Sequence, residues 1–380
     1  MPVASVASPV PAAPAPAPTP AVLMADPGTA GLQVIALTLL DRLVVAAHRA
    51  GCQPIVVVSK GPPPRLIRAE ALGIRFQVVP TPSRLNARTL VADTRLLVLA
   101  PDLRRLLAAG GRLVDAEGRP LPAGIIERTG PLVRDPWAGL PEVKATGVAV
   151  GITDEASARA ASEKLWASLS SSADGTVDRY FNRPIGRWLM SRWLVHTPVT
   201  PNQISIGATL LGVTAGTMFG MGDPTLSIAA ALLFQFSAII DCVDGDVARA
   251  VFKESPLGKW LDLIGDQVVH ASIFAGIAFG LWRHGTDRPH LWLGGSALIG
   301  GFISFAVILR GMRRPGGSDG RLQKLIDAAT NRDFSVLVLT LAVADRLGWF
   351  LWMAAIGSHV FWILALALQF PRRAGTVSSR

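Results

Sequence analysis

Cysteine is scarce in this 380-residue sequence, which contains only Cys52 and Cys242. Two distant cysteines exclude a disulfide scaffold and a zinc ribbon, and they are typical of small apolar side chains in a reducing compartment. Charged residues are also few, at 17%, whereas 50% of the residues are hydrophobic. A chain this apolar is not wholly soluble, so the composition predicts a membrane part, and the length allows a second unit.

Negative charge is the scarcer sign, with 27 Asp and Glu against 37 Lys and Arg and a formal net charge of +10. Such an excess is compatible with nucleic-acid binding. Beside apolar runs, however, it more often belongs to basic loops that face anionic lipid headgroups. We therefore expect membrane lipid among the partners, and no nucleic acid.

The first 21 residues consist mostly of Pro, Ala and Val and contain no basic segment. Because prolines interrupt the helix that a signal sequence needs, residues 1–21 are predicted to be a disordered leader. Residues 22–169 alternate short apolar runs with helical patterns, which predicts a soluble α/β domain. Strands are expected at 54–59, 75–79, 95–100 and 147–151, and helices at 38–50 and 65–72.

A polar hinge at 170–175 separates this domain from a much more apolar one. Apolar segments near membrane-spanning length occur at 204–221, 226–240, 263–282, 291–309, 334–344 and 350–370. Since a span needs about 20 residues, residues 201–370 are predicted to form an all-α transmembrane domain of six helices, followed by a tail at 371–380. The second and fifth helices reach this length only with polar ends.

Lys and Arg collect before the first apolar segment and after the second and the fourth, and the alternate loops contain few of them. The positive-inside rule then predicts that both termini and the basic loops face the cytoplasm. We expect a multi-pass protein of the bacterial inner (plasma) membrane.

Residues 170–200 are predicted to hold a linker and an amphipathic helix in the membrane interface. Arg179, Arg183 and Arg187 are four residues apart and share one helical face, opposite Trp188 and Leu189. Arginines near lipid phosphates and apolar side chains among acyl carbons are typical of such a helix. A soluble amphipathic helix that docks on the α/β domain is the alternative.

Four aspartates between the second and third apolar segments are the most informative feature. Asp241 and Asp244 are three residues apart, and Asp262 and Asp266 are four apart, so each pair shares a helical face. Ionised carboxylates gathered at a membrane helix end require a cation. All-oxygen ligands suit Mg²⁺ or Mn²⁺, and four carboxylates suffice for two ions. Alternatively, these acids merely pair with nearby Arg and Lys side chains.

The residues around the aspartates also fit phosphate binding. Gly245 and Ala248 leave room for a ligand near the backbone, and Arg249 presents a fork for phosphate oxygens. Ser255 and Gly258 lie in the same stretch and are expected to line the same pocket.

This pattern resembles the complete signature of the CDP-alcohol phosphatidyltransferase family. It runs Asp241, two residues, Asp244-Gly245, two residues, Ala248-Arg249, eight residues, Gly258, three residues, Asp262, three residues, Asp266. Thr200-Pro201-Asn202 is similar to a second motif of the family. The resemblance implies six transmembrane helices, a homodimer, two divalent ions (Mg²⁺ or Mn²⁺) and displacement of CMP from a CDP-linked donor by an alcohol acceptor, in phospholipid or inositol-phosphate biosynthesis.

Residue by residue, the resemblance implies that the four aspartates hold metal and that Asp266 is also the catalytic base; spacing leaves open whether Asp266 is base, ligand or both. The implied binding residues for the CDP donor are Asn202, Gly245, Ala248, Arg249, Ser255 and Gly258.

Arg332, with other arginines nearby, is a candidate for binding an acceptor phosphate, as in family members that use inositol phosphate. The alternative is that these arginines only follow the positive-inside rule. His270, four residues beyond Asp266, is interpreted as a hydrogen-bonded core histidine rather than a ligand.

Residues 22–169 are similar, more weakly, to cytidylyltransferases with a Rossmann-like nucleotidyltransferase fold, including those fused to this membrane domain in enzymes of di-inositol-phosphate synthesis. The resemblance lies in the helix 38–50 before the strand 54–59, and in Asp102, where such enzymes place a metal-binding aspartate. The first loop, 25–31, lacks Lys and Arg. We therefore expect a degenerate domain that serves regulation, assembly or acceptor delivery.

The sequence does not decide whether the donor is CDP-diacylglycerol or CDP-inositol. A transporter or channel would place polar residues deep in several helices, whereas here they gather at one end of two. A non-catalytic membrane scaffold, whose α/β domain binds a partner, is the remaining alternative.

Overall fold

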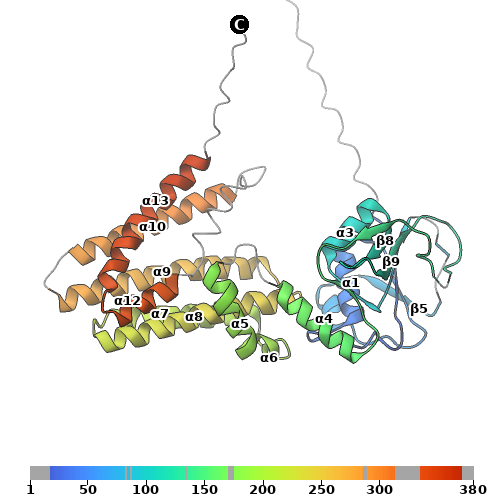
Figure 1. Ribbon diagram of the computed structural model, residues 1–380, viewed down its shortest axis with the longest axis horizontal. Coiled ribbons are helices and arrows are strands. Elements are labelled where there is room, and N and C mark those ends of the chain that lie inside the picture. Colours follow the sequence, from blue (N-terminus) through green and yellow to red (C-terminus); the bar gives the residue numbers. More distant parts are fainter. Residues whose placement is uncertain are drawn as a thin grey trace, which may run out of the picture. The chain divides into compact units, whose positions relative to one another are not determined.

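The chain divides into two units at Ser168 and Leu169. The computed structural model describes residues 18–369, without 82–83, 86–87, 134, 170–174, 286–288 and 313–333. The first unit is α/β and the second is helical, as the sequence predicts (Figure 1). The tail 371–380 and most of the leader and hinge lie outside the described residues, but Ala21 already opens a strand.

A mixed seven-stranded sheet forms the centre of the first unit, in the order β10-β8-β9-β6-β1-β4-β5. Its strands are β1 (Ala21–Met24), β4 (Ile55–Val58), β5 (Phe76–Val79), β6 (Thr89–Asp93), β8 (Gly111–Val114), β9 (Pro120–Ile126) and β10 (Glu142–Lys144). Strand β1 pairs in parallel with β4 and β6, and β9 is antiparallel to β6 and β8. The unit also contains the helices α1 (Leu39–Arg49), α2 (Ile67–Ala71), α3 (Ala100–Ala109) and α4 (Glu155–Ser168). Two further strand pairs are β2 (Gln33–Val34) with β3 (Leu37–Thr38), and β7 (Leu96–Val98) with β11 (Ala149–Gly151).

The strands expected at 54–59, 75–79 and 147–151 and both expected helices are confirmed, as β4, β5, β11, α1 and α2. The run 95–100 was expected to be one strand, but the strand ends at Val98 and α3 begins at Ala100. Both cysteines are free and buried, and burial raises the pKa of the Cys52 thiol to about 12, so this side chain is neutral and packs as a small apolar group.

The second unit is built mainly of helices in its described residues. They are α7 (Pro201–Phe219), α8 (Pro224–Ala250), α9 (Pro256–His284), α10 (Pro289–Met312), α12 (Phe334–Val343) and α13 (Leu347–Gln369). In the described part of the chain, α8, α9, α10 and α13 are long and apolar enough to cross a membrane, and α12 is a shorter apolar helix. These four spans are those of an integral membrane protein.

The helix α8 is longer than expected, because it continues ten residues past Ile240 to Ala250. The apolar pattern predicts an end at Ile240, because Asp241 interrupts the apolar run there. A polar residue, however, does not break a helix whose backbone hydrogen bonds continue. Phe252, with φ 56°, ends the helix, and the Ser255 side chain caps the start of α9 by accepting a hydrogen bond from the Gly258 N–H. Five residues therefore return the chain to the same end of the bundle.

Glycines bring α7 close to its neighbours, and α7 packs against both α8 and α9 (Figure 1). A side chain at Gly276 of α9 would collide with the backbone of Gly216 in α7, and one at Gly212 would meet Val269. Phe219, Phe234 and residues of α9, α12 and α13 complete the buried core. This packing fixes the ends of α7, α8 and α9 relative to one another.

A connecting segment, Asp178–Leu194, precedes α7 and is helical throughout, as η1 (Asp178–Asn182), α5 (Arg183–Gly186), η2 (Arg187–Ser191) and α6 (Arg192–Leu194). Its aromatic face is exposed, as expected: Tyr180 and Trp188 are 75% and 77% accessible. The expectation that Arg183 and Arg187 face lipid phosphates is wrong. Both side chains lie against α8 and pair there with Asp246, a carboxylate that the helical pattern of the segment alone does not reveal.

Candidate active site

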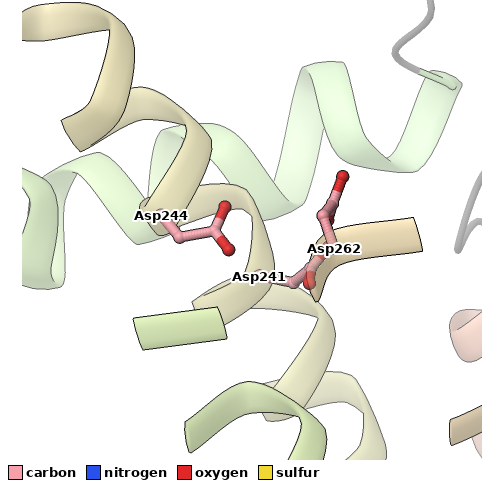
Figure 2. A group of neighbouring side chains, drawn as sticks. All are labelled: Asp241, Asp244 and Asp262. Carbon is pink, nitrogen blue, oxygen red and sulfur yellow. The ribbon is translucent and has the colours of Figure 1, made fainter. Parts of the chain in front are cut away.

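Three of the four signature aspartates gather between α8 and α9. Asp241, Asp244 and Asp262 each offer a carboxylate oxygen, and these three oxygens lie within 4.8 Å of one another. Figure 2 shows the Asp244 carboxylate pointing toward the other two. Asp244 is buried, Asp241 is half-buried and Asp262 is exposed. Oxygens at this separation can ligate one ion without rearrangement of the helices.

Asp266 lies one helical turn beyond Asp262 on α9 and is half-buried. It does not belong to the close group of three carboxylates found in the described part of the chain. It lines the same cavity as Asp241 and Asp262. Asp266 is therefore separate from the three clustered carboxylates and lines the cavity beside them.

A first cavity, of about 150 Å³, lies at the start of α7 and α9 beside the aspartates. The six residues expected around the CDP group all line it: Asn202, Gly245, Ala248, Arg249, Ser255 and Gly258. Asp244 and Asp262 form part of its wall, and Lys253 and Lys259 add positive charge. A small cavity lined by both cations and carboxylates can accommodate a phosphate together with its counter-ion.

Local packing explains why the signature has glycine at positions 245 and 258. A Cβ at Gly245 would lie 3.2 Å from two nitrogens of the Arg249 guanidinium, which lies back over the helix at this point. A Cβ at Gly258 would lie 3.0 Å from Oδ1 of Asn202 and 3.1 Å from Oγ of Ser255. Glycine at both positions thus keeps the cavity open where α7, α8 and α9 meet.

Ser205 of α7 belongs to this site, although the sequence analysis did not identify it. Its hydroxyl donates a hydrogen bond to Oδ2 of Asp244, and both side chains are buried. Ser205 lies one turn after Asn202 on the same helix. That spacing places it on the face of Asn202, which is the only signal in the sequence for its role.

A second cavity, of about 600 Å³, lies next to the first among α9, α10, α12 and α13. Asp241, Asp262 and Asp266 stand at one part of its lining, and five phenylalanines cover much of the rest: Phe274, Phe305, Phe334, Phe350 and Phe361. His270 also lines it, with its ring 5.0 Å from that of Phe334. Arg249 and Asp262 line both cavities, so the two spaces meet at these side chains.

Arg332 lies outside the described residues, so the expected contact with an acceptor phosphate has no counterpart in the structure.

Asp102, at the position where the similar cytidylyltransferases place a metal-binding aspartate, does not face solvent in this chain. Its carboxylate is buried and accepts hydrogen bonds from the Thr146 and Gly147 amides and from the Thr146 hydroxyl. These donors make Asp102 an anchor for the 146–147 loop rather than a metal ligand facing solvent. Asp93 instead ends the central strand β6 and is held by Arg95.

The first loop of the α/β unit, 25–31, contains no Lys or Arg. Between β1 and β2, Asp26 accepts hydrogen bonds from the Gly28 amide and the Thr29 hydroxyl, and its own amide donates to the Thr94 hydroxyl.

Comparison with known proteins identifies a family model and several relatives. Residues 198–370 match the family model described as CDP-alcohol phosphatidyltransferase. Over 112 residues the chain is 36% identical to a bifunctional IPC transferase and DIPP synthase of Thermococcus kodakarensis, a match that covers 30% of this chain and 24% of that protein. Over 184 residues it is 28% identical to a phosphatidylinositol phosphate synthase of Mycobacterium tuberculosis, which covers 47% and 78% of the two chains.

Among solved structures, Mycobacterium tuberculosis phosphatidylinositol phosphate synthase in complex with manganese and citrate matches at 20% identity and a TM-score of 0.36. That match covers 50% of this chain and 88% of the other. The chain spans about a quarter of the length of the bifunctional relative. The matched range 198–370 includes all four signature aspartates, and the helical unit of this chain is therefore a CDP-alcohol phosphatidyltransferase domain.

Proposed function

We propose that the chain is an integral membrane transferase that moves a phosphate-linked group from a CDP-linked donor to a hydroxyl acceptor and releases CMP. The observation that carries the proposal is the group of three carboxylates, Asp241, Asp244 and Asp262, at the border of two cavities. Carboxylates this close repel one another unless a cation lies between them. Their oxygens suit Mg²⁺ or Mn²⁺, and Asp266 nearby supports a second ion.

In this proposal the cytidine diphosphate occupies the first cavity, where Asn202, Ser255 and Gly258 surround it and Arg249 binds its phosphates. The acceptor oxygen attacks the phosphorus that carries the transferred group, and Asp266 accepts the proton of that hydroxyl. The bond from this phosphorus to the bridging oxygen breaks, and CMP leaves with the electron pair. Divalent ions bound by the aspartates would offset the charge on the diphosphate and on the departing CMP.

The apolar lining of the second cavity favours a lipid donor, CDP-diacylglycerol, over CDP-inositol. Phenylalanines from α9, α10, α12 and α13 form much of its wall. Acyl chains gain free energy from such a lining, whereas the hydroxyls of an inositol would lose hydrogen bonds to water there. The acceptor, inositol phosphate or an unphosphorylated alcohol, would approach from the side of Asp266.

The same proposal includes the membrane topology, the oligomeric state, the location and the domain organisation of the chain. We propose six membrane crossings, with α7 and α12 as the fifth and sixth, a homodimer, and a bacterial inner membrane location with the site in the cytoplasm. We also propose that residues 22–169 are a degenerate nucleotidyltransferase-like domain joined through 170–200 to the transmembrane domain at 201–370. The lack of basic residues in the first loop supports its degeneracy.

The test is CMP release by detergent-purified protein with Mg²⁺, with CDP-diacylglycerol and CDP-inositol offered separately, each with inositol and with inositol phosphate. We expect release from the lipid donor. Asp262→Asn should lower release by at least about a hundredfold, because it removes an ion ligand at the reacting phosphate. Mn²⁺ should raise the melting temperature of the natural protein and have no such effect on Asp262→Asn.

The matched control is Asp345→Asn, which makes the same charge change between α12 and α13. Asn tolerates the φ of 53° at this position, so this variant should keep full activity. Release from CDP-inositol alone would overturn the lipid donor. No release from any donor, with no stabilisation by Mn²⁺, would favour the non-catalytic scaffold instead.

A further inference from the structure

Asp246 is a buried carboxylate of α8 that lies outside the group of signature aspartates. Its side chain is 1% exposed and is surrounded by guanidinium groups. Arg183 Nη1 donates to its Oδ1 at 2.6 Å, and Arg187 Nε donates to its Oδ2 at 2.6 Å. Arg249 Nη2 donates to Oδ1 at 3.0 Å. One carboxylate thus binds three arginines, two from the connecting segment and one from α8.

Two of these arginines belong to the connecting segment, whose backbone approaches α8 closely. A Cβ at Gly186 would lie 2.9 Å from the Val243 side chain and 3.2 Å from the Ile239 carbonyl oxygen. Asn182 reinforces the contact, because its Oδ1 accepts a hydrogen bond from Gln235 Nε2 at 2.6 Å. The segment also contributes Asp178 and Arg183 to the wall of the second cavity. It is therefore part of the site and not only a link to it.

The third arginine, Arg249, lines both cavities, and its direction is set by two neighbours. Gly245 leaves space beneath its guanidinium, and Asp246 bonds it through Nη2. A long flexible side chain that has to meet a phosphate loses rotamer entropy on binding. A buried carboxylate that already holds the guanidinium removes much of that cost.

We propose that Asp246 is a positioning residue that holds Arg249 toward the diphosphate of the donor and clamps the connecting segment to α8 as a wall of the site. This inference rests on the proposed function. If it holds, the loss of Asp246 acts through Arg249 and weakens donor binding. A carboxylate with a purely structural role would change the amount of folded enzyme and leave the KM of that enzyme as it was.

A double-mutant cycle with CDP-diacylglycerol tests the link to Arg249. Asp246→Asn and Arg249→Gln should each raise the donor KM by about tenfold, as expected for one lost charge-assisted hydrogen bond, with kcat nearly unchanged. The double variant should have the KM of Arg249→Gln alone, because the guanidinium through which Asp246 acts on the donor is already absent. Asp246→Glu, which keeps the charge, should restore part of the affinity.

Asp223→Asn is the control for charge on the same helix, because this residue caps the far end of α8 and an Asn retains the cap. Its KM should match that of the natural protein. Additive increases in the cycle, or an unchanged KM in Asp246→Asn, would overturn the inference while CMP release by the natural protein upholds the proposed function.

Trypsin cleavage tests the clamp without relying on activity. Trypsin does not cut after Arg183, because Pro184 follows it, so Arg187 reports on release of the connecting segment. Cleavage after Arg187 should be faster in Asp246→Asn than in the natural protein or Asp223→Asn. Equal cleavage rates would refute the clamp even if no donor supports CMP release.

Discussion

At the scale of residues, a single hydrogen bond orients one of the signature aspartates. Ser205 donates its hydroxyl to the buried carboxylate of Asp244, and the same serine lies one turn from Asn202 in the first cavity. A carboxylate that ligates an ion is usually oriented by such a partner. Ser205 therefore connects α7 to the aspartates of α8.

Ser205→Ala should weaken the activation of CMP release by Mn²⁺ about tenfold or more, because Asp244 loses the group that orients it. The measurement is the Mn²⁺ concentration needed for half-maximal release. Thr214→Ala on the same helix is the control, because the exposed Thr214 hydroxyl bonds only the Leu210 carbonyl in the described structure. Equal Mn²⁺ requirements in both variants would contradict a role for Ser205.

Residues that form a motif can be identified from the sequence. Residues whose ion-pair or hydrogen-bond partners are distant in the chain cannot. The signature aspartates are recognisable because their spacing repeats along two helices. Asp246 stands among them, yet its partners Arg183 and Arg187 are 63 and 59 residues away, and no local pattern links them. The hydrogen bonds of Asp102 are hidden from the sequence for the same reason, because its partners lie at 146–147.

At the scale of elements, apolar periodicity predicted the position of most helices but not their ends. The end of α8 was missed because ten of its residues leave the apolar pattern while its backbone bonds continue. The strand β6 was also missed, since TLVAD offers three apolar residues between polar ones. Its identity as a central strand depends on pairing with β1 and β9, which lie far away in the sequence.

Because α7 and α9 approach each other closely, a larger side chain at their contact should destabilise the protein. Gly276→Ala should destabilise the protein by about 1–3 kcal/mol, because the new methyl group would meet the Gly216 backbone and force the helices apart. CMP release should also fall, since Asn202 of α7 and Gly258 of α9 line one cavity. Thermal unfolding in detergent measures the first effect.

Gly207→Ala provides a matched control on α7, because a Cβ there would meet nothing within 4 Å. Its melting temperature should stay equal to or above that of the natural protein, as alanine favours helix over glycine. A similar loss of stability in both variants would show that close packing at Gly276 is not the cause.

At the scale of the whole molecule, the distribution of Lys and Arg predicts which ends of the helices share a compartment. The α/β unit and the loop 251–255 should lie on one side, and the α7–α8 connection on the other. In intact cells, a membrane-impermeant maleimide should therefore label Thr225→Cys and not Glu155→Cys. Labelling of both positions only after the membrane is opened would contradict this orientation.

The native cysteines do not interfere with that experiment, because Cys52 and Cys242 are both buried. Labelling of the natural protein in detergent should confirm their protection before either variant is used.

The length of α8 and α9 has a consequence for the surroundings of the chain. Their 27 and 29 residues extend over about 40 Å at about 1.5 Å per residue, whereas the hydrocarbon core of a bilayer is about 30 Å thick. The surplus lets the aspartate-bearing turns stand at headgroup depth while the rest of each helix stays in hydrocarbon. A thicker bilayer would draw those turns inward, so the thickness of the host membrane becomes a physical control on how readily water-borne molecules reach the aspartates.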